Sequence, residues 1–427
     1  MRTLRVSAAA IGVMAALCRP AAAIDILDRI VAFTEDRVRQ ASVGKTDGPA
    51  PLRIGLMLPA DGEFREPAER LTRGWKIAIA LSDGIVANRP VQIVPGDTAN
   101  SPVVAVQAAI DMMRAGPVDV FAGVIGADVA RAMAIFADKA DRPVVLAGAI
   151  GEGVMSGACS SRVVRTSFNI GPYQTTAGKF LAGKYRTAVT LAPDADGGPM
   201  LVRRFADAYR AAGGKVVEQA WAPPGRNYDW SGWIARLSAS GPTMIYAIFD
   251  ERNAERLVYA HSRAGLKGRV ALLGPEWMFG PRTLDRRGAH AAGLRFLTAY
   301  LPTSPSPANS GFVAAYRATF NESPDLYAYL GYENALSVLL TAAELEGKTD
   351  DAEKFIATLK ALDYTGLMPR GAFTFNATGS AGLSRLYWVE AQRVDGETVL
   401  EELASVPVAP DRSTCSVRQA GTTRQPS

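Results

Sequence analysis

The sequence predicts an α/β fold made of two Rossmann-like lobes, each built on a parallel sheet. Short apolar strands alternate with amphipathic helices from Leu52 to Pro275, a pattern typical of parallel βαβ units with helices on both faces of the sheet. The strands are too many for one compact sheet, and a chain of 427 residues exceeds one typical domain. Two sheets, and therefore two lobes, fit both observations.

The chain begins with the three parts of a secretory signal peptide. Arg2 and Arg5 supply the basic segment, residues 7–17 form an apolar segment too short to span a bilayer, and residues 21–23 are three alanines that fit a cleavage site. We expect removal of residues 1–23, with an amphipathic helix as the alternative. No later stretch of the sequence has the ~20 apolar residues that a membrane helix needs. An exported mature protein is therefore expected.

Residues 24–51 are predicted to form a helix and a linker that precede the first lobe. Apolar residues recur at helical spacing between Ile24 and Ser42, whereas Lys45 to Pro51 is polar and contains Gly and Pro. The apolar stripe could pack against the protein's own lobe or dock a partner protein, and the sequence leaves both interpretations open.

The alternating elements follow in order from Leu52. Val120 to Ala149 reads as strand, glycine turn, helix and strand. The other predicted strands are 52–59, 90–97, 162–168, 187–193, 215–223, 243–249 and 270–275. The helices between them are predicted at 67–82, 102–115, 174–185, 200–212, 230–238 and 251–264.

The pattern changes beyond LRFLTAYLP, residues 294–302. Three helices in a row are predicted at 312–320, 329–345 and 352–362, and the tyrosines at 327, 329 and 332 are expected to pack in a core. A strand is predicted at 371–379, followed by a hairpin over 385–403 with its turn at Asp395-Gly396. Residues 409–427 are predicted to be a disordered tail.

The charge balance argues against nucleic acid as a partner. Without the three arginines of the signal peptide, 47 − 3 = 44 basic residues face 42 acidic ones, an excess of only +2. Two cysteines remain, Cys159 and Cys415, which could form a disulfide in an oxidising compartment or stay as two free thiols.

Recognisable catalytic and cofactor motifs are missing from the sequence. It has no HExxH, CxxC or GxSxG motif, GVIGADVA does not match GxGxxG, and GPYQTTAGKF lacks the first glycine and the Ser/Thr of a phosphate loop. We therefore expect a binding protein without a cofactor or metal rather than an enzyme. A ligand would sit at the carboxyl ends of the strands, in a cleft between the two sheets.

The order of the segments resembles type I periplasmic solute-binding proteins of the leucine/isoleucine/valine-binding kind, which serve branched-chain amino-acid ABC transporters. The resemblance starts with LRIGLMLPADGEF and a helix bearing Arg73-Gly74, continues through GDTANSPVVAVQAAIDMMRAGPVDVFAGVIG and VVRTSFN, and includes FVAAYRATFNESPDLYAYLGYENALSVLLTAAE. It extends from about Leu52 to Gln392. The individual motifs are weak, but their order and spacing are specific.

This resemblance implies a hinge with three crossings between the lobes, expected near Phe168, Tyr300 and Asp363. The first lobe would comprise 52–168 plus 301–363, and the second 169–300 plus 364–408. It also implies a periplasmic location and delivery of the solute to the membrane permease of an ABC importer. We expect a monomer.

The resemblance also places candidate ligand contacts in the first lobe. In the family's amino-acid binders, a Ser or Thr after the fourth and fifth strands donates to the ligand carboxylate, helped by N–H groups of helix N-termini. The matching places here are Gly126-Ala127-Asp128 and Ala149-Ile150, which lack the hydroxyl. Asp128 would repel a carboxylate, or it could cap the following helix. Ile150 and, in the first loop, Phe64 are expected to form apolar walls, with core packing as the alternative for Ile150.

In the second lobe, Phe249 and Asp250 follow one predicted strand, and Glu276 and Trp277 follow the next. Asp250 could face the cleft or cap a helix. Glu276 falls where some members of the resembled family use a carboxylate to hold a ligand ammonium group. A charged residue directly after a buried strand needs a partner, which could also be a structural ion pair. Trp277 could stack on a ligand or pack on the core.

Acidic candidates outnumber basic ones at these loop ends, which favours a ligand with an amine or many hydroxyls over a free carboxylate. We therefore expect a small polar or amphipathic solute: an amino-acid-like compound, an amine, an amide or a polyol. The alternative function is a sensory module of the same fold that signals to a partner protein.

Overall fold

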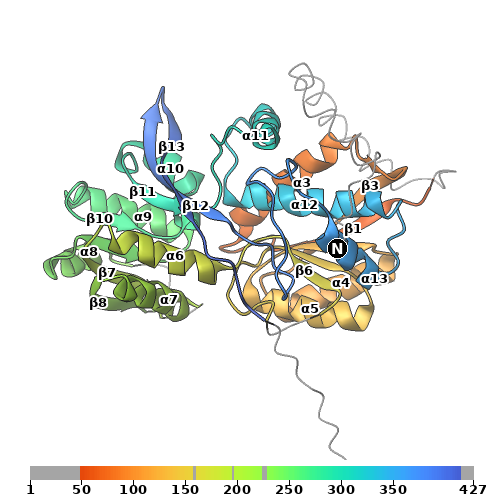
Figure 1. Ribbon diagram of the computed structural model, residues 1–427, viewed down its shortest axis with the longest axis horizontal. Helices are drawn as coiled ribbons and strands as arrows, with labels where there is room; N and C mark the ends of the chain where they lie inside the picture. Colours follow the sequence, from red (N-terminus) through yellow and green to blue (C-terminus); the bar gives the residue numbers. More distant parts are fainter. Residues whose placement is uncertain (1–48, 157–159, 195–196, 224–227, 415–427) are drawn as a thin grey trace, which may run out of the picture.

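The computed structural model describes residues 49–156, 160–194, 197–223 and 228–414 (Figure 1). These residues form two α/β lobes that lie side by side, which confirms the predicted fold class. The signal peptide, the predicted helix 24–42 and both candidate disulfide residues, Cys159 and Cys415, lie outside the described residues.

The first lobe is built on a six-stranded sheet in the order β2-β3-β1-β4-β5-β6. All neighbouring pairs are parallel except the short hairpin of β2 and β3. Strands β4 and β5 consist entirely of buried residues, as expected for strands covered by helices on both faces. The strands are β1 (Leu52–Leu58), β2 (Ile85–Val86), β3 (Arg89–Asp97), β4 (Val120–Ile125), β5 (Val144–Gly148) and β6 (Val163–Arg165).

Helices cover both faces of this sheet. On one face lie α3 (Arg65–Leu81), α12 (Leu326–Glu344) and α13 (Ala352–Ala361), and on the other α4 (Pro102–Ala115) and α5 (Ala127–Ala140). Helices α3 and α12 touch through two glycines. A Cβ added at Gly74 would lie 2.1 Å from the Ala328 carbonyl oxygen, and one at Gly331 would lie 2.0 Å from that of Leu71. Neither position can carry a side chain, so the two helices pack backbone against backbone.

The second lobe combines a parallel sheet with a smaller antiparallel one. Helices α6 and α7 pack on one face of the parallel sheet and α8 and α9 on the other. The parallel order is β10-β9-β7-β8, with β7 (Thr187–Pro193), β8 (Lys215–Ala222), β9 (Met244–Ala247) and β10 (Ala271–Leu273). The antiparallel order is β11-β12-β13, with β11 (Arg295–Thr298), β12 (Arg385–Val394) and β13 (Glu397–Pro407). The helices are α6 (Ile170–Ala182), α7 (Gly198–Ala211), α8 (Trp230–Ala239), α9 (Glu251–Arg263), η2 (Glu276–Phe279), α10 (Pro281–Arg287) and η3 (Gly288–His290).

The predicted hairpin is confirmed. Strands β12 and β13 pair from end to end, and Asp395 and Gly396 form the turn with φ angles of 51° and 87°. Positive φ at both turn residues matches the twist of the two strands, and the Asp-Gly pair tolerates it. β13 extends four residues beyond the predicted end at 403.

The chain passes between the lobes three times. The first crossing joins β6 to α6 and contains Phe168, and the second joins β11 to α11 (Pro307–Phe320) and contains Tyr300. Within the predicted strand 371–379, only Phe375 forms an isolated bridge, to Ala381, and the next residue after the predicted strand, Ser380, bridges Arg165 of β6. The chain therefore stays at the edge of the first sheet and crosses only before Arg385, later than the expected position near Asp363.

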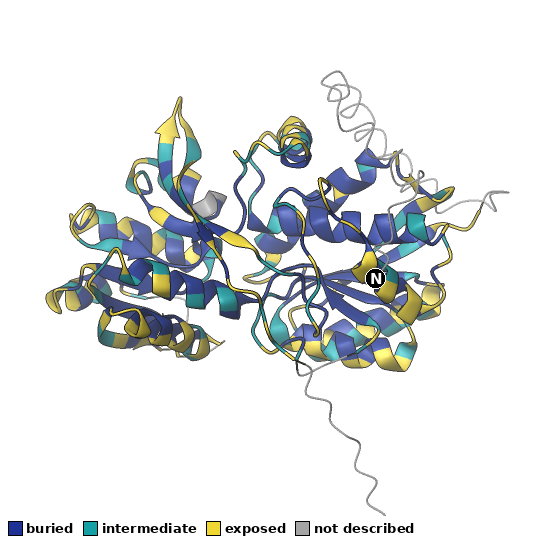
Figure 2. Ribbon diagram, in the orientation of Figure 1, coloured by how far each residue is buried: buried dark blue, intermediate teal, exposed yellow. Residues whose placement is uncertain are grey.

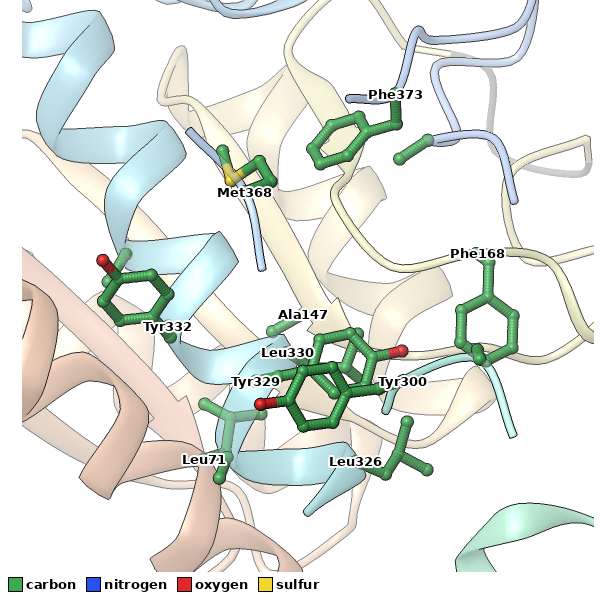
Figure 3. Packing of buried hydrophobic residues seen from close by; sticks show 14 of the residues in the cluster. Leu71, Ala147, Phe168, Tyr300, Leu326, Tyr329, Leu330, Tyr332, Met368 and Phe373 are labelled. Atoms are coloured by element: carbon green, nitrogen blue, oxygen red, sulfur yellow. The ribbon is translucent and has the colours of Figure 1, made fainter. Parts of the chain in front are cut away.

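One buried core runs through the crossings and joins the lobes (Figure 2). The rings of Tyr300, from the second crossing, and Tyr329, from α12, lie with their centroids 4.5 Å apart. Figure 3 shows this pair with Leu71 and Leu326 beside it. An aromatic ring of the second crossing is therefore packed against a helix of the first lobe.

The C-terminal tail is described as far as residue 414, and part of it is anchored. The Asp411 carboxylate accepts hydrogen bonds from the side-chain amides of Asn169 and Asn376, both at 3.0 Å. The prediction of disorder from residue 409 is therefore wrong for this anchored part. None of the described helices has the length and hydropathy of a membrane-spanning segment.

Candidate binding site

A pocket of about 100 Å³ lies between the lobes, beside the second crossing. Its walls come from the segment after β10, from β11 and the residues that follow it, from the connection between α11 and α12, and from β13. The lining residues are Glu276, Trp277, Phe279, Gly280, Leu284, Asp285, Phe296, Thr298, Tyr300, Pro302, Thr303, Arg317, Ser323, Pro324, Asp325, Leu326, Tyr327, Thr398, Val399 and Leu400.

Charge is distributed unevenly in this pocket. Three carboxyl groups, those of Glu276, Asp285 and Asp325, face a single guanidinium, that of Arg317. Glu276 is buried, whereas Arg317 is exposed and donates to the Ser323 hydroxyl at 2.6 Å. The buried part of the lining therefore carries Glu276 and Asp325, whereas the exposed part carries one carboxylate, Asp285, and one guanidinium, Arg317.

Glu276 lies in the buried part of the lining, with 5% of its surface exposed. It begins η2, directly after β10 and Pro275. Oε2 accepts hydrogen bonds from the Thr298 hydroxyl and from the Ala299 N–H, the latter at 2.9 Å. Oε1 is buried and has no hydrogen-bond partner. A buried carboxylate oxygen without a donor is costly, so the site is set up to receive one.

Burial raises the pKa of Glu276 to about 7. The hydrogen bonds from Thr298 and Ala299 work against this shift, the nearby Asp325 carboxylate adds to it, and Arg370 opposes it. Glu276 can therefore be protonated or ionised near neutral pH, and a cation at Oε1 would favour the ionised form.

Aromatic side chains form much of the pocket wall. Trp277 is half-buried, packs against the cores on both faces of the second lobe and donates from Nε1 to the Phe249 carbonyl at 3.1 Å. It thus lines the pocket and packs on the core at once. Tyr327 is half-buried and packs against the core, as expected, but it also lines the pocket. Tyr329 and Tyr332 are buried as expected.

Phe249 and Asp250, the other candidates in the second lobe, do not line the pocket. Phe249 is buried in an aromatic cluster with Tyr228 and Trp230. Asp250 caps α9, where its carboxylate accepts from the Asn253 N–H at 3.0 Å. Of the two interpretations of Asp250, the structure therefore supports the helix cap.

The first glycine turn lies away from the pocket as well. Gly126, with a φ of 93°, is the residue that precedes α5, so the interpretation of Asp128 as the helix cap is wrong. The Asp128 side chain is 74% exposed and forms an ion pair with Arg131, one turn along the helix. Ala127, between Gly126 and Asp128, is the first residue of α5 and is half-buried.

The remaining candidates of the first lobe serve its own packing. Ala149 is buried, and its carbonyl accepts from the Arg165 guanidinium at 3.0 Å. Ile150 and Phe64 are half-buried and pack against the first lobe's core. Of the ten candidate ligand contacts, only Glu276 and Trp277 lie at the pocket.

The sequence analysis missed several polar residues between the lobes, above all Arg70. Arg70 is buried on α3 and forms ion pairs with Glu251 and Asp325. A signal was present in the sequence: Arg70 interrupts the apolar stripe of α3 between Pro67 and Gly74. The pocket wall formed by β13 could not be found this way, because it comes from a part of the chain far from Glu276.

Among the described residues, no cluster of His, Cys, Asp or Glu side chains could hold a metal ion.

Comparisons with known proteins identify the family to which the two lobes are similar. A family model described as a periplasmic binding protein matches residues 51–397. No curated protein matches the sequence.

Solved structures share the fold along nearly their full length. A solute-binding protein of an ABC transporter from R. palustris, in complex with benzoate, is 23% identical with a TM-score of 0.77, covering 86% of this chain and 100% of that one. One from Rhodopseudomonas palustris BisB5, in complex with 3,4-dihydroxybenzoic acid, is 24% identical with a TM-score of 0.77, covering 86% and 99%. A leucine-binding protein from Thermotoga maritima is 20% identical with a TM-score of 0.71, covering 83% and 99%.

Proposed function

The chain belongs to the periplasmic binding protein family, and we propose that it captures a small amphipathic solute between its lobes and delivers it to the membrane permease of an ABC importer. The family model covers residues 51–397, which include both lobes. The protein is accordingly a solute-binding protein of the periplasm and not an enzyme. The importer is supported by the similar structures, several of which are solute-binding proteins of ABC transporters.

The solute site in this proposal is the pocket beside the second crossing. The single observation that carries it is the buried Glu276 Oε1, which has no hydrogen-bond partner and lies in a pocket with aromatic walls. Glu276 would accept from the solute, and Trp277 and Tyr327 would cover its apolar part. The first-lobe candidates from Phe64 to Ile150 are assigned no direct contact, because their side chains serve packing or lie in solvent.

The proposed solute carries an ammonium or another hydrogen-bond donor on an apolar or aromatic body. Two of the similar proteins are in complex with benzoate and with 3,4-dihydroxybenzoic acid, and an aromatic ring would suit these walls. A carboxylate beside Glu276, however, would meet another acidic group there, and Arg317, the one cation among the described lining residues, is exposed. Repulsion between like charges in a desolvated site disfavours that arrangement.

A thermal-shift screen of the purified mature protein tests the ligand class. The probes are phenethylamine, phenylalanine, leucine, benzoate and a polyol such as glycerol. A probe at 100 times its dissociation constant raises the free energy of unfolding by ~2.7 kcal/mol. We expect the amine-bearing aromatic probes to give the largest shifts. If benzoate, which has no ammonium, gives the largest shift, the assignment of Glu276 as the ligand's acceptor is wrong. If leucine gives the largest shift, the preference for an aromatic body is wrong.

Three finer points belong to the same proposal. The signal peptide is cleaved near Ala23, the mature protein is a monomer, and the partner is a permease rather than a signalling protein. Mass spectrometry of the exported protein and its mass in solution test the first two. The sensory alternative depends on the predicted helix 24–42 as a docking element, and co-purification with a kinase or cyclase instead of a permease would favour it.

A further inference from the structure

Arg70 joins three elements at the interface between the lobes. From α3 of the first lobe, its Nη2 lies 2.7 Å from Oε2 of Glu251, at the start of α9 in the second lobe. Its Nε lies 2.8 Å from Oδ2 of Asp325, the residue that caps α12 in the first lobe. The three side chains are 9%, 9% and 11% exposed. The ion cluster is therefore buried, and one of its two pairs spans the lobes.

The two pairs respond differently to movement of the lobes. Helices α3 and α12 pack backbone against backbone through Gly74 and Gly331, so the Arg70–Asp325 pair stays together whenever the first lobe is intact. Glu251 belongs to the other lobe, and a hinge rotation about the crossings would take it away from Arg70. Of the two pairs that Arg70 forms, only the pair with Glu251 therefore depends on whether the lobes are closed.

The cluster also forms part of the boundary of the pocket. Asp325 and Tyr327 line the pocket, and the Arg70 guanidinium lies 5.7 Å from the centre of the Tyr327 ring. On the opposite side, Gly280 lines the pocket and lies against Glu251: a Cβ added there would be 2.5 Å from Glu251 Oε1. Formation of the ion pair therefore brings together two walls of the pocket, one from each lobe.

Electrostatics favours keeping the cluster intact. Burial alone would lower the pKa of Arg70, but the carboxylates of Asp325 and Glu251 outweigh it and hold the pKa above its ordinary value. A guanidinium with two carboxylates in a poorly solvated place interacts strongly with both. Breaking one pair without supplying water or a substitute partner leaves a buried charge uncompensated.

We propose that Arg70 and Glu251 latch the two lobes in the closed arrangement before any solute binds, so that the pocket walls meet without a ligand. In this role they are positioning residues for solute capture and touch no solute themselves. The inference concerns the same pocket as the proposed function and extends it, but its first test requires no solute and can succeed or fail independently.

A second ion pair between the lobes provides a matched control. Glu152 follows β5 in the first lobe and pairs with Arg204 on α7 of the second lobe. The Arg204 side chain is 54% exposed, so solvent can replace its partner when the lobes separate. Both ion pairs therefore join the two lobes, but the Arg70–Glu251 pair is buried and the Arg204 side chain of the other pair is exposed.

The test measures the distance between the lobes in the solute-free protein by pulsed electron paramagnetic resonance. Spin labels are attached at Lys76→Cys on α3 and Arg263→Cys on α9, both exposed, with Cys159 and Cys415 replaced by Ser. We expect one short distance in the otherwise unmodified protein. Glu251→Gln should shift the distribution to longer distances, and Glu152→Gln should leave it unchanged.

Two results would overturn the latch: a long distance in the unmodified protein, or a Glu251→Gln distribution identical to it. Circular dichroism confirms that each variant is folded, and Arg70→Gln provides a second way to break the same pair. If a probe from the screen binds, Glu251→Gln should also weaken its apparent affinity in proportion to the lost closed fraction, about tenfold if one tenth of the molecules remain closed. A failed screen with a successful distance test would reject the proposed solute class and leave the latch standing.

Discussion

Each side of the interface between the lobes has a carboxylate directly after a strand of its parallel sheet, but the two carboxylates lie in opposite environments. On the first lobe, Asp128 follows β4, lies in solvent and pairs with Arg131 on its own helix. On the second lobe, Glu276 follows β10, is buried and keeps one oxygen without a partner. Position after a strand is therefore not enough to make a residue a ligand contact; burial without a partner is the distinguishing property.

The largest expected effect on stability comes from removing an arginine that pairs with buried carboxylates, compared with removing one that pairs with an exposed carboxylate. Arg70→Met removes the guanidinium that pairs with the buried carboxylates of Glu251 and Asp325, and should lower the free energy of unfolding by about 3–5 kcal/mol. The control, Arg131→Met, removes the partner of an exposed carboxylate and should change it by less than about 1 kcal/mol. Guanidinium denaturation measures both, and equal effects would remove the distinction between the two sides.

The pH dependence of stability comes next in size. The pKa of Glu276 is about 7 in the folded protein against 4.5 for an ordinary glutamate. Since the folded state holds this proton more tightly, the contribution of Glu276 to stability is fully present below about pH 4.5 and is lost as the pH rises through about 7. The loss is roughly 3 kcal/mol.

Glu276→Gln isolates this contribution, because the neutral side chain can still accept from Thr298 and Ala299. The variant should match the wild type at pH 5 and be more stable than it at pH 8. The comparison with the variant is needed because burial also raises the pKa of Glu333 to about 7, against its ion pair with Arg370. A pH profile of the variant parallel to that of the wild type would contradict the prediction.

Solute binding should show a smaller but selective effect. Glu276→Gln removes the charge from the proposed acceptor and should weaken binding of phenethylamine by roughly 1.5–3 kcal/mol, about 10- to 150-fold. Calorimetric titration at pH 8, where Glu276 is ionised, measures the change. Unchanged affinity would make Glu276 a structural residue.

The smallest expected effect concerns Asp128. Asp128→Asn should alter both the affinity for the same probe and the stability by less than about 0.5 kcal/mol, because the side chain is solvated. The same titrations measure it. A clear loss of affinity would show that the first lobe contributes a charge to the solute after all, and would remove the contrast between the two sides.

Much of the fold could be predicted from the sequence because its signals are local. Apolar runs and helical spacing identify strands and helices, and Asp395-Gly396 identifies its turn. The third crossing comes later than expected because residues 371–379 have the composition of a strand but form no strand, and Ser380 directly after them bridges Arg165 at the edge of the first sheet. The position of this segment depends on its contacts with β6, which is distant in the sequence. The periodicity of apolar residues does not predict such contacts.

The candidate site was less predictable for the same reason. Glu276 and Trp277 were identified because they follow a buried strand, but Asp250 and Asp128 share that property and serve a helix cap and a surface ion pair. The other pocket walls, such as Tyr327 and the β13 residues Thr398 to Leu400, reach the site only through tertiary packing. No spacing along the chain links them to Glu276.

The participation of β13 in the pocket has a consequence for the order in which the protein can become functional. The pocket wall at Thr398 to Leu400 belongs to β13, the last strand among the described residues. Its partner β12 also pairs with β11, the strand that leads into the second crossing. Even if the first lobe folds early during synthesis, the pocket lacks a wall until nearly the whole polypeptide has emerged. The pocket can therefore be completed only late in synthesis. A chain that ends before β13 could form both parallel sheets but would lack one wall of the pocket.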